Sequence, residues 1–184
     1  DNCYVCDAGC VDACIFDGTG DVTPGEGSDL GDGVPVVNDI VIIVAAIIGN
    51  VDPENPWTEC DDNAADMNGD GTVNVLDVMT IVQAVMNPDP ARADVLMPSS
   101  VELIQSANRL SYKLNVDGLV GFELTLSHDG DCEFNLSNEA FISSFNTSEN
   151  ITKMVIVNES GNELFTSTGE FEIVDILVGS AEGA

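Results

Sequence analysis

The sequence predicts an α+β multidomain protein, with two loop–helix repeats in its N-terminal half and an antiparallel β-sandwich in its C-terminal half. Before residue 87, loops rich in Asp, Asn and Gly precede apolar runs of helical length. After Pro88 and Pro98, apolar and polar residues alternate, which is typical of half-buried strands. We therefore expect a cysteine-rich segment over 1–19, a helical domain over 20–92 and a β domain over 93–184.

The strongest local signal is the segment from Asp66 to Asp77, DMNGDGTVNVLD. Oxygen-bearing side chains occupy its positions 1, 3, 5, 9 and 12, and Gly71 occupies position 6. Ca²⁺ takes six to eight oxygen ligands, and a glycine at the sixth position permits the sharp turn between them. The apolar run from Val78 to Met86 predicts a helix that leaves the loop, as in half of an EF-hand. We expect this loop to bind calcium, with Asp77 in place of the usual Glu.

A second copy of this unit begins 38 residues earlier. The segment from Ser28 to Asp39, SDLGDGVPVVND, shares two glycines, the central Asp and the final Asp with the intact loop. An apolar run from Ile40 to Ile48 follows it. Neither helix could bury its apolar face alone, so we expect the two copies to pack against each other.

Two such loops, each followed by one helix and separated by a linker, resemble a type I dockerin module over about Gly20 to Asn87. The resemblance implies a calcium-binding module that docks onto a protein partner. In the second loop it implies ligation by the side chains of Asp66, Asn68, Asp70 and Asp77, by the carbonyl of Thr72 and, through water, by Asn74. In the first loop it implies ligation by Asp32 and Asp39, with Val34 as the carbonyl donor.

The first loop departs from the pattern at its start. Ser28 stands where the first Asp is expected, and Asp29 is a candidate to shift into the gap. A second register begins at Asp21, so that Asp21 and Thr23 supply the first ligands and 24–31 form an insertion. The sequence leaves both registers open, and we expect this site to be the weaker one.

Dockerins present residues early in each helix, and one turn further along, to their partner. The corresponding residues here are mostly apolar, which fits either a docking surface or packing inside the protein. They are Val37, Asn38, Val44 and Ala45 in the first unit and Val75, Leu76, Val82 and Gln83 in the second.

The charge of the chain restricts the classes of partner. There are 33 Asp and Glu against four Lys and Arg, for a formal net charge of −29. Nucleic acid and anionic membrane surfaces both require basic residues, so neither is an expected partner. The longest apolar run, Ile40 to Ile48, is too short to span a bilayer. Since bound Ca²⁺ would neutralise part of the charge, we expect the stability of the fold to depend on calcium.

Cysteines and glycosylation sequons predict an extracellular or cell-surface setting. An even count of six cysteines in an acidic chain favours disulfides, although the first four lie close enough together to hold zinc or an iron–sulfur cluster instead. The start at Asp1 is typical of a mature, processed form. The cysteines are Cys3, Cys6, Cys10, Cys14, Cys60 and Cys132, and the sequon asparagines are Asn135, Asn146, Asn150 and Asn158.

Alternation in the C-terminal half predicts six or seven strands, which is typical of a small antiparallel sandwich. The segments 119–127 and 170–178 resemble strands of cohesin-like β-sandwich modules. The half is shorter than a full cohesin, so we expect an open sheet edge that could recruit a strand from a neighbour. The expected strands are 101–104, 110–116, 120–126, 133–136, 152–157 and 170–178.

We expect no catalytic activity, because the single histidine, His128, lies beside a turn and no nucleophile–base order or phosphate-binding loop is present. The sequence is interpreted as an extracellular calcium-binding scaffolding protein. Dockerin-like and cohesin-like parts on one chain predict head-to-tail association of copies into a filament. The alternative is a dockerin-bearing adaptor that docks onto a separate cohesin scaffold in a polysaccharide-degrading assembly.

Overall fold

A computed structural model describes residues 18–22, 34–54, 56–86, 98–158 and 161–179. The chain divides into two compact units, Asp1–Ala91 and Arg92–Ala184. Several predicted site residues lie outside the described residues, namely Cys3, Cys6, Cys10, Cys14, Thr23, Ser28, Asp29 and Asp32.

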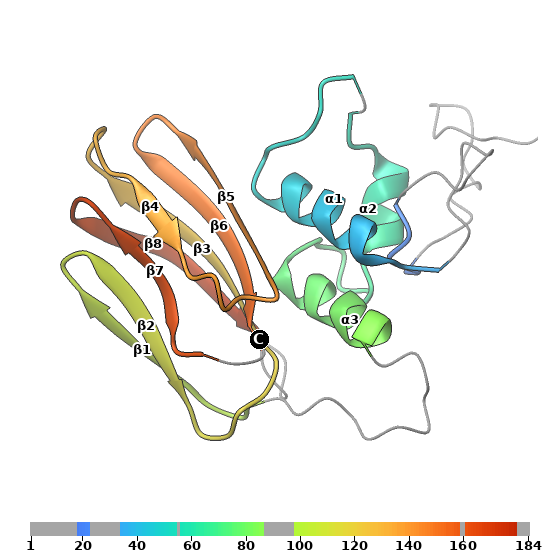
Figure 1. The fold of residues 1–184 in the computed structure, drawn as a ribbon. Coiled ribbons are helices and arrows are strands. Elements are labelled where there is room, and N and C mark those ends of the chain that lie inside the picture. The colour runs from blue at the N-terminus through green and yellow to red at the C-terminus, as the bar shows by residue number, and fades with distance from the viewer. Residues whose placement is uncertain (1–17, 23–33, 55, 87–97, 159–160, 180–184) are drawn as a thin grey trace, which may run out of the picture. The chain divides into compact units, whose positions relative to one another are not determined.

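The described residues of the N-terminal unit form three helices (Figure 1), α1 (Val37–Ile47), α2 (Glu59–Ala65) and α3 (Val75–Met86). Helices α1 and α3 pack against each other, and their first residues are separated by the same 38 positions as the sequence repeat. The prediction of a helix after each loop is therefore confirmed, although both helices begin three residues earlier than expected. No helix among the described residues has the length and apolar character needed to cross a membrane.

Helix α2 lies in the linker, where no helix was expected. Its start is fixed by a reciprocal pair of hydrogen bonds: the Asp61 backbone N–H donates to Thr58 Oγ1 at 3.4 Å, and the Thr58 backbone N–H donates to Asp61 Oδ2 at 2.7 Å. Such a capping box satisfies two of the amide groups that every helix start leaves without partners.

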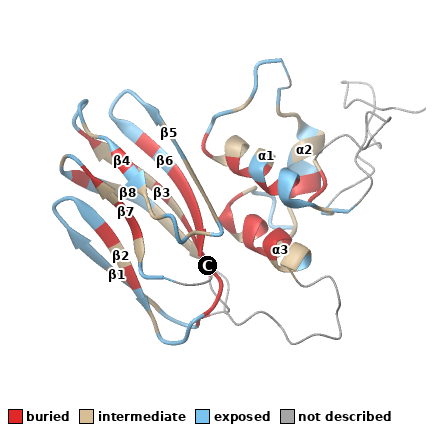
Figure 2. Cartoon of the chain, in the orientation of Figure 1, coloured by how far each residue is buried: buried red, intermediate tan, exposed pale blue. Residues whose placement is uncertain are grey.

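The core of the helical unit repeats like its sequence. Buried positions of α1 recur 38 residues later in α3, and Figure 2 shows buried residues on both helices. Val44, Val75 and Val82 are buried, so for these three residues packing inside the protein is the correct alternative. The buried pairs are Ile40 with Val78, Ile43 with Ile81, and Val44 with Val82.

In the C-terminal unit the described residues form two four-stranded antiparallel sheets, one ordered β1-β2-β7-β4 and the other β5-β6-β3-β8. The prediction of antiparallel strands is confirmed. Two strands were not expected, β5 and β7. The strands are β1 (Val101–Ser106), β2 (Arg109–Leu114), β3 (Val120–His128), β4 (Phe134–Leu136), β5 (Ile142–Ser148), β6 (Ile151–Asn158), β7 (Glu163–Ser167) and β8 (Phe171–Gly179).

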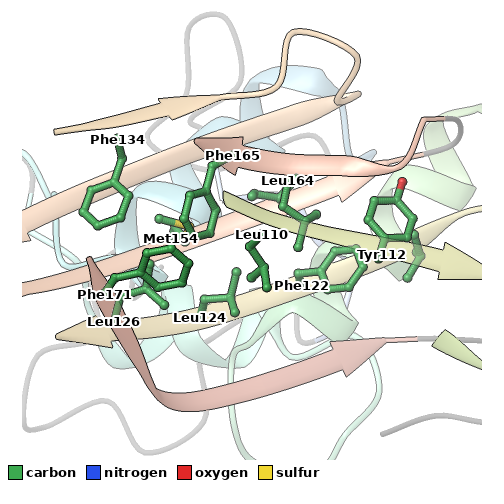
Figure 3. Close-up of a cluster of buried hydrophobic side chains, with 12 residues drawn as sticks. Leu110, Tyr112, Phe122, Leu124, Leu126, Phe134, Met154, Leu164, Phe165 and Phe171 are labelled. Atoms are coloured by element: carbon green, nitrogen blue, oxygen red, sulfur yellow. The ribbon is translucent and has the colours of Figure 1, made fainter. Parts of the chain in front are cut away.

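The two sheets share one hydrophobic core, in which side chains of both point toward one another (Figure 3). Phe165 of β7 is in ring contact with Phe134 of β4 and with Phe171 of β8, at centroid distances of 5.4 and 5.0 Å. Tyr112 of β2 contacts Phe122 of β3 at 5.0 Å. Full burial of one such side chain contributes about 1.5–3 kcal/mol, so this cluster is the main source of stability in the unit.

Strand β8 lies at an edge of its sheet and contains a β-bulge. Asp175 pairs with Thr125 of β3, while Ile173 pairs with Leu126, so Val174 between them is left without a partner on β3. The side chain of Val174 is 60% exposed. An extra residue of this kind bends an edge strand and disturbs its regular pattern of hydrogen bonds.

Candidate metal centre

The second loop is wound around the carboxylate of Asp66. Its Oδ1 accepts hydrogen bonds from the backbone N–H groups of Gly69 at 2.8 Å and Asp70 at 3.2 Å, and its Oδ2 accepts one from Gly71 at 2.9 Å. Gly69 and Gly71 have φ values of 74° and 85°, in the left-handed region that favours glycine. The glycines of the motif therefore allow the loop backbone to fold over the first predicted ligand.

Asn68, Asp70 and Asn74 of the loop each accept a hydrogen bond from the backbone amide two residues further on. The Asp70 N–H donates to Asn68 Oδ1, and the Thr72 N–H donates to Asp70 Oδ1, both at 2.8 Å. Asn74 is buried, where its Nδ2 donates to the Thr72 carbonyl at 3.0 Å and its Oδ1 accepts from the Leu76 N–H at 2.8 Å. These tight local turns bring the oxygens of the predicted ligands around one small loop.

Asp77 closes the loop from inside the first turn of α3. Its carboxylate is fully buried and accepts hydrogen bonds from the backbone N–H groups of Met67 at 2.9 Å, Asn68 at 3.2 Å and Asn74 at 2.9 Å. Burial raises the pKa of this carboxyl, the three backbone N–H groups act in the opposite direction, and the negative charge of Asp66 raises the pKa further.

The charge around Asp77 fits a bound cation. The sequence before Arg92 contains 18 Asp and Glu and no Lys, Arg or His, so no basic side chain within this unit can neutralise the buried carboxylate. Buried charges in proteins are normally paired or coordinate metals. An all-oxygen set of donors is the kind that hard cations such as Ca²⁺ prefer.

Within the ranges that the structure describes, no three His, Cys, Asp or Glu side chains gather as a metal-binding group. The carboxylates of Asp66 and Asp77 instead hold the loop backbone. An ionised carboxylate has about four acceptor positions, so it can keep these hydrogen bonds and still ligate a metal. The donor set of the second loop, which also includes an amide and a carbonyl oxygen, therefore fits calcium.

The first loop is closed in the same way by Asp39, which is also fully buried. Asp39 Oδ2 accepts from the Val36 backbone N–H at 2.7 Å, as Asp77 accepts from Asn74, and Asp39 Oδ1 accepts from the Val22 N–H at 3.1 Å. The second contact is equivalent to the one that Met67 makes in the other loop. Val22 directly follows Asp21, just as Met67 directly follows Asp66, so the geometry favours the register that begins at Asp21.

The burial of Asp21 agrees with this register, because its side chain is only 4% exposed. The preceding Gly20 donates its N–H to the Ala64 carbonyl at 2.8 Å and has a φ of 73°. A Cβ at Gly20 would lie 2.7 Å from Ile81 Cγ1, so a side chain here would collide with α3. Val34, the expected carbonyl donor, is described and exposed.

The structure corrects one of the expected disulfides. Cys60 is disulfide-bonded, but Cys132 is a free thiol. Cys132 is the only cysteine in the C-terminal unit, where it packs against the sheet core and lies 3.6 Å from the position that a Cβ on Gly169 would take. It behaves as a small hydrophobic residue rather than as half of a disulfide.

The structure also corrects one of the expected glycosylation sites. Asn158 is fully buried in β6, and its Nδ2, the atom that would carry a glycan, donates to Tyr112 Oη at 3.0 Å. The prediction of a glycan at Asn158 is therefore wrong for the folded protein. Asn135 and Asn150 are exposed and Asn146 is partly exposed, and the glycan predictions for these three residues stand.

His128 is held on both sides of its buried ring. Its Nδ1 lies 2.8 Å from the Asp129 carbonyl and its Nε2 lies 2.8 Å from Thr152 Oγ1. A carbonyl can only accept, so Nδ1 carries a hydrogen, and in the neutral ring Nε2 accepts from Thr152. Both ring nitrogens are occupied by structural hydrogen bonds.

Two packed loop–helix units, each closed by a buried Asp at the helix start, define a small docking module of the EF-hand type. Residues 31–86 match the family model of the dockerin type I domain, and this segment is a type I dockerin module that covers less than a third of the chain. Type I dockerins bind calcium and dock onto cohesin domains, and proteins that carry them are typically secreted or on the cell surface. Comparison with curated proteins and with solved structures gives no match.

Proposed function

We propose that this protein is an extracellular adaptor that uses calcium to dock onto a cohesin domain of another protein. The observation that carries the proposal is the matched pair of buried carboxylates, Asp39 and Asp77, inside a segment that matches the dockerin type I family. The dockerin match supports this adaptor better than the self-assembling filament, because dockerin domains take cohesin domains as their partners.

Calcium would hold the N-terminal unit in its docking conformation. In the second loop the proposed ligands are the side chains of Asp66, Asn68, Asp70 and Asp77 and the Thr72 carbonyl, with Asn74 acting through water. In the first loop they are Asp21 and Asp39, together with residues of the intervening segment. The bound ion supplies the positive charge that the sequence of this unit lacks.

The proposed docking surface lies on α1. Val37 and Val41 are one helical turn apart, so they share a face, and their side chains are 53% and 51% exposed. Their equivalents in α3, Val75 and Met79, are buried. The two helices are therefore not interchangeable, and the apolar surface available to a partner belongs to the first loop–helix unit.

For the C-terminal unit we propose a non-catalytic β-sandwich. Two antiparallel sheets that share one core support the sandwich architecture. The hydrogen bonds on both nitrogens of His128 support a structural role for the only histidine of the chain. We assign this unit the role of a spacer or of a second binding module carried by the adaptor.

The experiment is a binding assay of the full chain against a panel of immobilised recombinant cohesin domains, in calcium and in chelator. We expect calcium-dependent capture by at least one cohesin, and its loss in the double variant Val37→Asp/Val41→Asp. Val174→Asp places one such charge on a similarly exposed valine of the other unit, and the single variant Val37→Asp, which adds the same charge, is compared with it; Val174→Asp should leave capture unchanged. Size-exclusion chromatography in calcium distinguishes the adaptor from the self-assembling filament. Large assemblies that form without cohesin and grow with protein concentration would favour the filament and contradict the adaptor.

A further inference from the structure

A pocket with a volume of about 260 Å³ lies in the N-terminal unit beside the linker that precedes α2. Its apolar walls include Ile42 and Ala45 of α1, together with Trp57 from the linker. Asp52 and Asp61 are also among the residues that line it. Small-molecule sites usually enclose about 300–1,000 Å³, so this pocket is sized for one side chain rather than for a cofactor.

The polar residues around the pocket are fixed by hydrogen bonds. The indole Nε1–H of Trp57 donates to Asp62 Oδ1 at 2.6 Å, which fixes the ring against the start of α2. Asp61 Oδ2 accepts from both the backbone N–H and the hydroxyl of Thr58, at 2.7 and 2.6 Å. Asp52 Oδ1 accepts from the Glu54 N–H at 2.9 Å. A binding partner would therefore meet carboxylates that are already positioned, at little cost in side-chain entropy.

The chemistry of the pocket selects a cationic side chain with an apolar stem. Aliphatic walls and an indole accept the stem, and the two carboxylates attract a positive head. No basic residue of this unit can compete for them, because the first Lys or Arg of the chain is Arg92. Arginine fits better than lysine, since its planar guanidinium stacks on aromatic rings and also forms bidentate pairs with carboxylates.

We propose that this pocket binds one arginine side chain of the docking partner. The inference rests on the proposed docking function and adds a second contact to it, separate from the exposed valines of α1. The valines supply apolar contact area, whereas the pocket supplies a charged anchor. Partners without a suitably placed basic residue would then bind less tightly.

Trp57 reports on this pocket directly, because it is the only tryptophan of the chain. The calcium-loaded full-length protein is titrated with Nα-acetyl-arginine amide while the tryptophan fluorescence is followed. We expect a saturable change that Nα-acetyl-norleucine amide, which has a similar stem without charge, does not produce. The lysine analogue should bind more weakly than the arginine probe.

Matched variants separate pocket binding from general attraction to an acidic protein. Asp52→Asn keeps an acceptor for the Glu54 N–H but removes a charge, and it should weaken arginine binding about two- to five-fold, the size expected of a partly exposed ion pair. Glu59→Gln removes an equal charge from an exposed residue that does not line the pocket, and it should change nothing. Ala45→Leu should fill the pocket and abolish the signal, with circular dichroism as the check on folding.

The proposal is overturned if no saturable change occurs, if norleucine amide acts like the arginine probe, or if both charge variants weaken binding equally. Its failure is distinguishable from failure of the docking function. Cohesin capture that persists while the arginine probe does not bind would leave only the docking function standing. Probe binding without cohesin capture would leave only the pocket.

Discussion

Asp39 and Asp77 perform the same structural task at positions 38 residues apart. Asp39 accepts a hydrogen bond from the Val36 backbone N–H at 2.7 Å, and Asp77 accepts one from the Asn74 N–H at 2.9 Å. Each carboxylate also reaches the start of its own loop, at Val22 and at Met67 respectively. A single buried acid in each unit thus ties the loop start to the helix start.

Replacing Asp77 with Ala should destabilise the N-terminal unit and remove calcium from the second loop together. One buried and two partly buried backbone N–H groups lose their acceptor. A fully buried unsatisfied donor costs about 1–3 kcal/mol and a partly buried one costs less, so we expect a loss of about 2–5 kcal/mol in the free energy of unfolding. Chemical denaturation at saturating calcium measures it. Glu59→Ala, on an exposed residue of α2, is the control. Loss of calcium binding with unchanged stability and unchanged docking would contradict the clamp role.

Asp21 should be needed for calcium binding by the first loop, as Asp66 should be for calcium binding by the second. We expect Asp21→Ala to remove or strongly weaken one calcium-binding event in isothermal titration calorimetry, because Val22, which follows Asp21, contacts Asp39 as Met67, which follows Asp66, contacts Asp77. Ser28→Ala tests the other register and should leave that event unchanged. The reverse pattern, with Ser28 sensitive and Asp21 insensitive, would show that the loop begins at Ser28.

Removing calcium should destabilise the N-terminal unit selectively. A ligand that binds only the folded state stabilises it by about 2.7 kcal/mol at a concentration of 100 times its dissociation constant. Thermal unfolding in calcium and in chelator can be followed by Trp57 fluorescence, which reports the N-terminal unit alone because the chain has no other tryptophan. Thermal unfolding of the C-terminal unit, followed by near-ultraviolet circular dichroism of Tyr112 in a Tyr4→Phe/Trp57→Phe background, should not shift. An equal shift in both units would show that calcium acts outside the two loops.

Tyr112 should make the C-terminal unit sensitive to alkaline pH. Burial raises the pKa of its phenol above the ordinary value of 10.0, the hydrogen bond from Asn158 acts in the opposite direction, and the charges of Glu139 and Asp117 raise the pKa further. The folded state therefore holds this proton more tightly than the unfolded state. The stabilisation is fully present below about pH 10 and is lost as the pH rises toward the folded pKa.

The pKa of the Tyr112 phenol can be measured from the absorbance of the phenolate band in a Tyr4→Phe variant, which leaves Tyr112 as the only tyrosine. We expect ionisation at a higher pH in the native protein than in denaturant. Tyr112→Phe should remove this pH dependence above the ordinary pKa of 10.0, although it also removes the hydrogen bond to Asn158. A native titration curve that coincides with the denatured one would contradict the prediction.

The elements that are determined by a few neighbouring residues could be predicted from the local sequence. The helix after each loop follows from the glycine and Asp spacing, and the observed helix starts keep the 38-residue repeat. Helix α2 also had a local signal, the capping pair Thr58 and Asp61, which can be recognised in the sequence as Thr-x-x-Asp. Strand β5 had none, because ISSFNTS lacks a regular alternation of apolar and polar residues.

Features that depend on distant contacts could not be predicted from the sequence. The register of the first loop depends on a hydrogen bond between Val22 and Asp39, across an insertion that the local pattern cannot measure. The sequon at Asn158 reads like the other three, yet the pairing of β6 between two other strands buries its side chain against Tyr112. Tertiary packing therefore decides both the register of the first loop and the burial of Asn158.

The unpaired Val174 of β8 limits how this protein can associate. A regular edge strand offers a neighbour a continuous row of amide and carbonyl groups, and that row is interrupted at the bulge. A second chain adding there would have to match the same irregularity, which a generic extended peptide does not do. The β8 border of this sheet therefore resists lateral growth by addition of a further strand.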